Sequence, residues 1–373
     1  MAGTLTVLHL CSIKGRGGTG YMAARLCRLL RDQGVRVLVG ACAHSKMDAR
    51  ARAAGLERLE GLHLLRGFHP RALAADVRRI RACVRRENVD IVHVWHSIEY
   101  WTAAAALLGL RARLARTRGL VTPFRATWVN RLIHRRTALV HAACTRIAER
   151  YREAGFDMRR VRVVHDGVDL DRYAPGGDPG PVRREAGVPP DAPVVAAVGR
   201  LEPVKGHRVL LEAFAQVRAR APQAHLVLAG DGSERPALEA RAGAEDLRGA
   251  VRFLGVRKDV PAVLAAADVF ALASVGSEGS SRATLEAMAA GLPVVASAVG
   301  TLPDLVREGE TGLLAPPGDA QALADGLCAL VADPARRRTF GRAARARAEA
   351  EFDERRFARR MKDLYAEATQ CSP

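Results

Sequence analysis

The chain has 373 residues, of which 49% are hydrophobic, and it carries a net charge of +18 at pH 7. This length predicts two domains with packed cores. No run approaches the ~20 apolar residues that cross a bilayer, and the start lacks the basic segment of a signal peptide, which argues against a membrane-spanning or exported chain. The seven cysteines have no metal-ligand spacing, so we expect reduced thiols in a cytoplasmic protein.

Short apolar runs alternate with helical patterns in the first half. Predicted strands cover residues 5–11, 35–39, 91–95, 138–143 and 161–165, and predicted helices cover residues 21–31, 72–86 and 146–154. This alternation predicts a parallel sheet with helices on both faces. Residues 165–175 form the predicted hinge, and residues 176–181, rich in Gly and Pro, form a predicted loop.

The second half repeats the alternation, which predicts another α/β domain. Its predicted strands cover residues 194–198, 226–229, 251–254, 269–273 and 294–296. A helix is expected to begin near Ser281 and to end at Gly291. Further predicted helices cover residues 209–217, 336–349 and 355–367.

The positive charge lies in the first half. Residues 1–165 hold 31 Lys and Arg against 11 Asp and Glu, a net charge of +20, whereas residues 166–373 carry −2. The asymmetry predicts an anionic partner, either a membrane surface or a phosphorylated acceptor. Nucleic acid is disfavoured because aromatic residues make up 5% of the chain and no recognition motif accompanies the charge.

Two carboxylates stand eight positions apart in the segment SEGSSRATLEAM, residues 277–288. Glu286 falls inside the predicted helix, where a carboxylate can accept hydrogen bonds from both ribose hydroxyls of a nucleotide. Glu278 lies in the loop before that helix. The competing interpretation is two ordinary carboxylates on and before a helix start.

A second motif, GRLEPVKG, occupies residues 199–206 directly after a predicted buried strand. Such loops at the carboxyl ends of parallel strands bind ligands. A departing diphosphate needs cations to stabilise its charge; Arg200 offers a planar fork of donors and Lys205 a compact point charge. The two motifs together predict a pocket for a nucleoside diphosphate-sugar, and two solvated cations are the alternative.

In this order and at this separation, the two motifs resemble those of the retaining glycosyltransferases of family 4. The resemblance implies the α/β GT-B fold, in which two Rossmann-like, doubly wound domains face a central cleft. It implies an acceptor domain over residues 1–166 and a nucleotide-sugar donor domain over residues 167–350. Residues 351–373 are expected to form a helix that crosses back to the first domain.

The resemblance also implies roles for the residues of both motifs. Arg200 and Lys205 are expected to bind the diphosphate. Glu286 is expected to bind the ribose. Glu278 is expected to contact the transferred sugar and to steady its developing positive charge.

Backbone groups complete the implied donor site. The N–H groups of Ser281, Arg282 and Ala283 at the helix start are expected to bind the distal phosphate. Backbone groups near Leu254 and Val256, after a predicted strand, are expected to hold the base. Side chains there reveal little about which base is bound.

The glycine loop KGRGGTG, residues 14–20, has GxGxxG spacing between a strand and a helix. A dinucleotide site would also need an acidic residue at the end of the second strand, where VGAC stands at residues 39–42, so an NAD site is disfavoured. The resemblance implies that Gly17 and Gly18 approach the donor phosphates or the acceptor through their backbone. A tight turn without a ligand is the alternative.

Two histidines, His93 and His96, are expected near the end of the strand over residues 91–95, pointing toward the cleft. His96 is the candidate for orienting an acceptor hydroxyl, and a core histidine is the alternative. Some relatives carry a histidine after Arg-Thr-Arg, where this chain has Gly119. The resemblance implies a reaction on one face of the sugar, with the departing phosphate taking the acceptor proton.

No metal or other cofactor is expected. Asp169 and Asp171 match the DxD of metal-dependent sugar transferases, but they lie in the predicted hinge. Asp231 lies in a strand-to-helix turn, where capping is a sufficient explanation. The basic, amphipathic residues 124–136 predict either a membrane-contacting or a half-buried helix.

The sequence therefore predicts a metal-independent glycosyltransferase that moves a sugar from a nucleoside diphosphate-sugar to a hydroxyl of a saccharide or of a lipid-linked anionic acceptor. We expect a role in bacterial envelope polysaccharide or lipopolysaccharide synthesis, at the inner face of the cytoplasmic membrane. A sugar-nucleotide epimerase of the same fold is the first alternative, and an NAD-dependent oxidoreductase is the second. The base, the sugar and the acceptor stay open.

Overall fold

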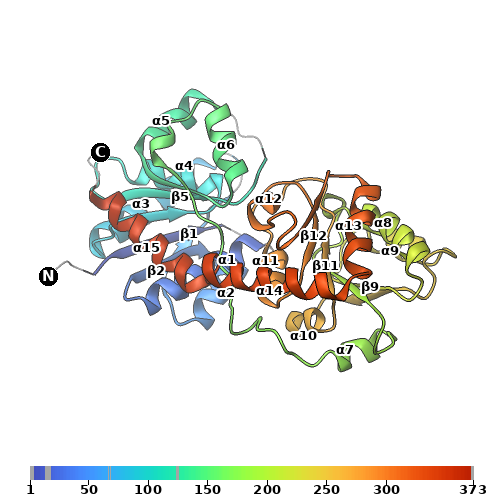
Figure 1. Cartoon of the computed structure of the whole chain (residues 1–373). Coiled ribbons are helices and arrows are strands. Elements are labelled where there is room, and N and C mark those ends of the chain that lie inside the picture. The colour runs from blue at the N-terminus through green and yellow to red at the C-terminus, as the bar shows by residue number, and fades with distance from the viewer. Residues whose placement is uncertain (1–3, 13–17, 66, 68, 123–125, 371–373) are drawn as a thin grey trace. The chain divides into compact units, whose positions relative to one another are not determined.

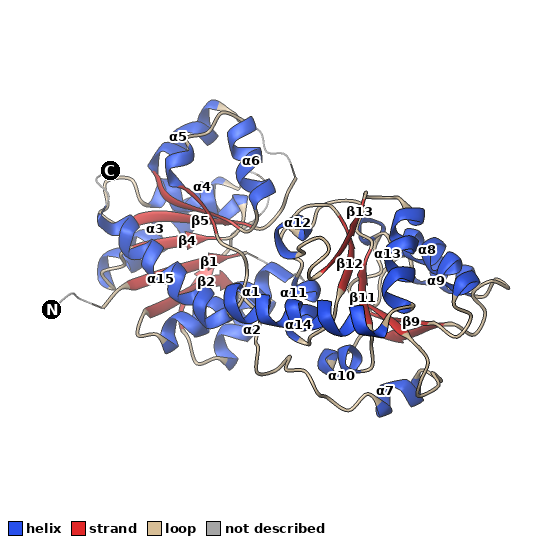
Figure 2. Ribbon diagram, in the orientation of Figure 1, coloured by secondary structure: helices blue, strands red, loops and turns tan. Residues whose placement is uncertain are grey.

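The computed structural model describes residues 4–12, 18–65, 67, 69–122 and 126–370. The chain divides into two compact units: unit 1 joins the segment up to Asp166 to the segment that starts at Glu354, and unit 2 comprises Gly167–Asp353. Each unit is a parallel sheet covered by helices, which confirms the predicted α/β class (Figure 1 and Figure 2).

The strands of unit 1 pair in the order β3-β2-β1-β4-β5-β6-β7, all in parallel. These strands are β1 (Thr6–Cys11), β2 (Arg36–Cys42), β3 (Glu57–Leu62), β4 (Ile91–Val94), β5 (Arg113–Arg118), β6 (Thr137–Ala142) and β7 (Val161–Val163). The helices are α1 (Gly18–Asp32), α2 (Lys46–Ala53), α3 (Pro70–Arg86), α4 (Ser97–Ala106), α5 (Trp128–Arg136), α6 (Thr145–Glu153) and α15 (Glu354–Gln370), with a short 3-10 turn at Met158–Arg160.

β1 is buried along its whole length because its side chains alternate between two cores. Val7 packs into the core that α1 and α15 cover, and Leu8 packs into the opposite core, which α3 and α4 cover. Figure 1 shows the red α15 beside the blue α1. A two-pronged ion pair between Arg25 and Glu354 joins these two helices.

The strands of unit 2 pair in the order β10-β9-β8-β11-β12-β13, again in parallel. These strands are β8 (Val194–Val198), β9 (His225–Ala229), β10 (Val251–Gly255), β11 (Val269–Leu272), β12 (Val294–Ser297) and β13 (Gly312–Ala315). The helices are α7 (Gly180–Glu185), α8 (His207–Arg220), α9 (Arg235–Ala242), α10 (Val260–Ala265), α11 (Arg282–Ala289), α12 (Leu302–Leu305), α13 (Ala320–Val331) and α14 (Pro334–Glu351), with a 3-10 turn at Pro203–Lys205.

The sequence analysis did not predict three of the observed strands. β3 and β13 are edge strands, and β5 reads Arg-Leu-Ala-Arg-Thr-Arg, with only two apolar residues. The residues 176–181, predicted as a plain loop, also include the start of α7. Within the described ranges, no helix combines the length and the apolar character needed to cross a bilayer.

Candidate functional site

The sheet of unit 2 reverses its strand order between β8 and β11. Open parallel sheets bind ligands beyond the carboxyl ends of the strands at such a reversal point. The loop after β8 carries Arg200 and Lys205, and the loop after β11 carries Glu278. Both sequence motifs therefore lie at the position in unit 2 where the fold favours a ligand.

The two loops are held close by their backbones. The N–H of Val275 donates to the carbonyl of Val204 at 3.0 Å. Gly206, directly after Lys205, has a φ of 64°, and a Cβ there would lie 1.9 Å from the carbonyl oxygen of Ala273. Glycine is therefore required at this position, since any side chain would push the two loops apart.

Lys205 and Glu278 form an ion pair across these loops. The same carboxylate accepts a hydrogen bond from the Ser274 hydroxyl at 2.6 Å. The Glu278 side chain is 4% exposed and that of Lys205 is 21% exposed. This Lys205–Glu278–Ser274 cluster is a fixed, partly buried polar site next to solvent.

The backbone of Glu278 is fixed as well. Its carbonyl accepts the N–H of Thr301 at 2.8 Å. Gly300 has a φ of 63°, and a Cβ at that residue would lie 2.0 Å from the same carbonyl oxygen. The segment after β12 thus packs directly on the loop that presents Glu278.

Arg200 differs from Lys205 in its surroundings. It is exposed, and its side chain makes no hydrogen bond or ion pair with the other residues that the structure describes. Glu202 on the same loop accepts a hydrogen bond from the Ser233 hydroxyl at 2.8 Å, so Arg200 presents an exposed positive charge that no carboxylate of the described residues pairs with. That charge suits an anionic ligand.

Glu286 lies on α11 and is 6% exposed. Arg282 Nε lies 3.0 Å from its Oε1 atom, one helical turn away, and the Tyr173 hydroxyl donates to the carboxyl group. Burial raises the pKa of Glu286 above its ordinary value, and Arg282 and Tyr173 offset only part of that rise. The carboxyl group thus has different partners from the Lys205–Glu278–Ser274 cluster.

The start of α11 has an unusual backbone. Ser281 precedes the helix with a φ of 21°, and its hydroxyl lies 2.9 Å from the Thr284 hydroxyl. The first N–H groups of a helix have no intrahelical acceptor. This geometry agrees with the expectation that Ser281, Arg282 and Ala283 offer backbone donors, which stays a prediction.

Leu254 and Val256 lie at the end of the edge strand β10, two strands from β8. Val256 is 65% exposed, and Leu254 packs partly against a small core that includes Val188 and Val263. The Gly255 carbonyl between them accepts the N–H of Gly230 at 2.7 Å. These contacts do not test a base site, which stays a prediction.

In unit 1 the strand order reverses between β1 and β4, and His96 follows β4. Glu99 accepts the N–H of His96 at 2.7 Å with one carboxylate oxygen and the N–H of Ser12 with the other. Burial alone would raise the pKa of Glu99, but hydrogen bonds from His96 and Ser12 outweigh it and lower the pKa. Glu99 thus anchors the loops that follow both strands.

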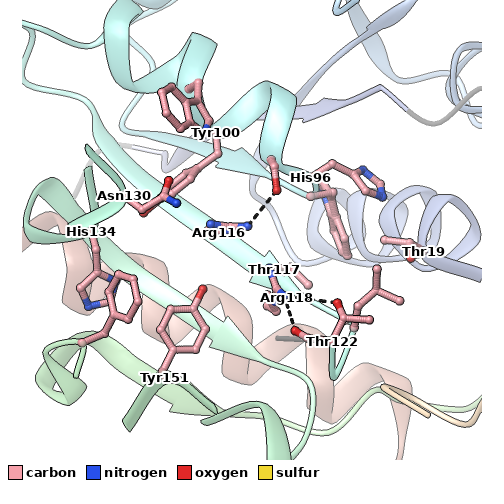
Figure 3. A pocket seen from close by; sticks show the side chains of 16 residues that line it. Thr19, His96, Tyr100, Arg116, Thr117, Arg118, Thr122, Asn130, His134 and Tyr151 are labelled. Carbon is pink, nitrogen blue, oxygen red and sulfur yellow. Dashed lines mark hydrogen bonds between the residues drawn. The ribbon is translucent and has the colours of Figure 1, made fainter. Parts of the chain in front are cut away.

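His96 also lines a pocket of about 370 Å³ in unit 1 (Figure 3). Figure 3 shows Arg116 and Arg118 on one strand, with side chains from α4, α5 and α6 around them. Of the glycine loop, Gly15 and Gly17 lie outside the described residues, and Gly18 is the first residue of α1.

Two protein-family models match the chain. "Glycosyltransferase Family 4" matches residues 16–172, and "Glycosyl transferases group 1" matches residues 192–333. The chain belongs to the family 4, group 1 glycosyltransferases. Both models describe glycosyltransferases, so neither the epimerase nor the oxidoreductase alternative is favoured.

Individual relatives agree with this assignment. The D-inositol 3-phosphate glycosyltransferase of Corynebacterium efficiens is 40% identical over 226 residues, which cover 57% of this chain and 52% of the relative. A GDP-mannose-dependent monoacylated alpha-(1-6)-phosphatidylinositol monomannoside mannosyltransferase of Corynebacterium glutamicum is 37% identical over 196 residues, covering 50% and 51%. The chain spans about half the length of the curated relatives it matches.

A solved structure matches over nearly the whole chain. The crystal structure of Anabaena HepE in complex with UDP and glucose has a TM-score of 0.83 and 26% identity, over 97% of this chain and 99% of that one. This match confirms the GT-B fold that the sequence predicts.

One expectation about the histidines is wrong. His93 lies inside β4 and is fully buried, with Nε2 2.7 Å from the Thr117 hydroxyl and Nδ1 2.5 Å from the Tyr365 hydroxyl. Burial lowers the pKa of His93 well below its ordinary value. It is a neutral core histidine because strand alternation turns it toward α15, and only His96 reaches the pocket.

The structure adds residues that sequence reasoning missed at the two sites. Ser274 and Tyr173 bond the two site glutamates, and Glu99 positions His96. Only Glu99 had a local signal, because its spacing of three from His96 at a helix start is that of a capping box.

Three aspartates, Asp169, Asp171 and Asp231, bear on the expectation that no metal is bound. Asp169 accepts the backbone N–H of Arg172 at 3.0 Å, and Asp231 accepts that of Gly232 at 2.8 Å, which are turn contacts. Over the described ranges, no three His, Cys, Asp or Glu side chains gather as metal ligands do.

Proposed function

We propose that the protein is a retaining, metal-independent glycosyltransferase whose unit 2 binds a nucleoside diphosphate-sugar. The observation that carries this proposal is the Lys205–Glu278–Ser274 cluster beside Arg200, at the reversal point of the unit 2 sheet. Family membership supplies the reaction class, and the cluster supplies residues suited to it.

In the proposed reaction, the bond between the anomeric carbon and the diphosphate oxygen breaks, and the diphosphate keeps the electron pair. Arg200 and Lys205 stabilise the charge that develops on this leaving group. The acceptor hydroxyl oxygen bonds to the anomeric carbon from the same face, and its proton passes to the departing phosphate. No further base is required.

Glu278 and Glu286 take the two remaining donor roles. Glu278 stabilises positive charge on the sugar ring, because a buried carboxylate acts strongly at short range. Glu286 accepts hydrogen bonds from the ribose hydroxyls, with Arg282 and Tyr173 holding its carboxyl group.

Two bases are the first to test. HepE was crystallised with UDP, and the mannosyltransferase relative is GDP-mannose dependent. We place the base at the backbone near Leu254 and Val256, where hydrogen bonding through main-chain groups would serve either nucleotide.

We assign the acceptor to the saccharide or lipid-linked intermediates of bacterial envelope polysaccharide or lipopolysaccharide synthesis. The +20 charge of residues 1–165 supports an anionic acceptor and peripheral contact with the inner face of the cytoplasmic membrane. On α5, Trp128 is 77% exposed and Leu132 is 43% exposed among basic residues, as a membrane-contacting helix requires.

The direct test is turnover of UDP- and GDP-sugars, with the anomeric configuration of the product read by NMR. Lys205→Ala should lower turnover by roughly 10²-fold, as for the loss of one transition-state donor. Arg248→Ala is the matched control. Arg248 precedes β10 and so lies at the amino ends of the strands, whereas Lys205 follows β8 at their carboxyl ends. Inversion at the anomeric carbon would refute the retaining mechanism, and full activity of Lys205→Ala would refute the site.

A further inference from the structure

The pocket in unit 1 that Figure 3 shows has the chemistry of an anion site. Residues of β5, α4, α5 and α6 line it, together with residues of the loops after β4 and β5. The described residues that line it include no aspartate or glutamate. We call it the arginine pocket, after Arg116 and Arg118.

Strand geometry turns both arginines into this pocket. Successive side chains of a strand point to opposite faces, so Arg116 and Arg118 share one face of β5. Thr117, between them, points the other way: its hydroxyl lies 2.7 Å from His93 Nε2 and 2.9 Å from His141 Nδ1 in the core.

Neighbouring side chains hold the two guanidinium groups. The Arg116 guanidinium carbon lies 4.2 Å from the centroid of the Tyr100 ring, and one of its nitrogens lies 3.4 Å from the Ser97 hydroxyl. Arg118 donates to the Thr122 carbonyl at 2.6 Å. Both cations are thus positioned by aromatic and neutral oxygen groups.

The two cations leave the arginine pocket positively charged. The pKa of Arg118 is lowered below its ordinary value. Burial is the larger cause, and the like charge of Arg116 is the second. The Nε–H of Arg116 is buried and has no hydrogen-bond partner among the residues described. A ligand with two negative charges would relieve the repulsion and accept from these donors.

We propose that the arginine pocket binds the phosphoryl group of a phosphorylated acceptor. Two guanidinium forks match the oxygens of a phosphate dianion better than they match a single carboxylate. The remaining wall offers hydroxyl and amide groups for sugar or cyclitol hydroxyls, from Ser97, Asn130 and Tyr151. The volume lies in the range of small-molecule sites.

This inference rests on the proposed glycosyl transfer, because it names the class of acceptor. His96 lines the same pocket, so a bound acceptor would lie beside the residue expected to orient its hydroxyl. The phosphoryl group would anchor the acceptor and leave a hydroxyl exposed for reaction.

Tryptophan fluorescence reads this pocket selectively. The tryptophans of the chain are Trp95, Trp101 and Trp128, all in unit 1, and the first two line the arginine pocket. A Trp128→Phe background, at an exposed position, confines the signal to the pocket. Phosphate bound by unit 2 would not be seen, because unit 2 has no tryptophan.

In that background, we expect inorganic phosphate to change the fluorescence saturably, and hexose or cyclitol monophosphates to bind more tightly than their unphosphorylated parents. Arg116→Gln and Arg118→Gln should each weaken phosphate binding about 10- to 100-fold, as for loss of a charged hydrogen bond. Arg116→Lys should keep part of the affinity. Arg111→Gln, which removes an exposed charge just before β5, is the matched control and should bind like its parent.

Equal binding of phosphate and acetate would overturn the phosphoryl assignment, as would Arg116→Gln and Arg118→Gln variants that fold and bind phosphate normally. No response of the parent protein to any phosphate would overturn it as well. Nucleoside diphosphate binding to the same samples is measured by calorimetry. If the parent protein binds a nucleoside diphosphate normally but one of the contrary phosphate results is found, only this inference is refuted. If the parent protein binds no nucleoside diphosphate, the proposed function is refuted.

Discussion

At the scale of single residues, the ion pair between Lys205 and Glu278 is expected to contribute both to the stability of unit 2 and to turnover. Lys205→Ala leaves a carboxylate that is 4% exposed without its cation, with Ser274 as its remaining side-chain partner among the described residues. Breaking such a pair from one side is strongly destabilising, at about 3 kcal/mol for buried cases. Activity loss in Lys205→Ala therefore has two possible origins, which must be separated.

The double variant Lys205→Ala with Glu278→Gln tests the origin in stability. The glutamine side chain keeps the shape of the glutamate without its charge, so unit 2 should regain most of the lost stability in urea unfolding followed by circular dichroism. Turnover should stay at least roughly 10²-fold low, because the cation is missing and Glu278→Gln also removes the carboxylate expected to stabilise the sugar. If the double variant is as unstable as Lys205→Ala, the ion pair is not what holds the loop.

At the scale of elements, continuous apolar runs made most of the sheet predictable. β1 and β8 were expected because strands buried on both faces read as apolar stretches. β5 was not expected, because the pocket-facing positions of that strand are arginines and its core-facing Thr117 bonds buried histidines. The polar pattern that hid this strand is the same pattern that builds the arginine pocket.

The site residues that could be predicted are those that belong to a recognisable sequence motif. Lys205 and Glu278 stand in short motifs, and the strand order brings these motifs together although they are distant in sequence. Ser274 and Tyr173 carry no motif, because their roles arise only from contacts that folding creates. His93 lies within the strand both in the prediction and in the structure, so its misplacement came from the face assigned to it: strand alternation turns it into the core.

α5 supports a prediction about membranes at this scale. Trp128→Ser should weaken binding to anionic vesicles in co-sedimentation, because it removes the most exposed large apolar side chain of the described residues. Val163→Ser, at a 40% exposed position on β7, is the matched control and should bind like the wild-type protein. Binding should fall at high salt, since the attraction is screened. Equal binding to neutral and anionic vesicles would refute the charge argument.

At the scale of the whole molecule, unit 1 should be the acid-labile part of the protein. Burial lowers the pKa of His9 to about 3 and that of His141 to about 4, and it lowers that of His93 well below its ordinary value. The unfolded chain therefore binds more protons than the native one below about pH 6.5. Stability is fully present above that pH and is lost as pH falls toward the native pKa values.

In this window, each of these histidines lowers the free energy of unfolding by about 1.4 kcal/mol for each unit by which the pH falls. The three together lower it by about 4 kcal/mol per unit. Urea unfolding followed by tryptophan fluorescence reads unit 1 alone, because all tryptophans lie there. The midpoint should be constant from pH 8 to 7 and should drop steeply from pH 6 to 5. A midpoint unchanged down to pH 5 would mean that the histidines are not held neutral in the core.

Nucleoside diphosphate binding at the two motifs of unit 2 is the property on which the proposed function depends. It can be measured by thermal unfolding with UDP, GDP, ADP and NAD in turn, for the wild-type protein and for Glu286→Ala. A ligand at ~100 times its dissociation constant should add about 2.7 kcal/mol to the stability of the unit it binds. We expect stabilisation by one nucleoside diphosphate, lost in Glu286→Ala; stabilisation by NAD alone, or by a nucleotide that the variant binds equally well, would contradict the proposed site.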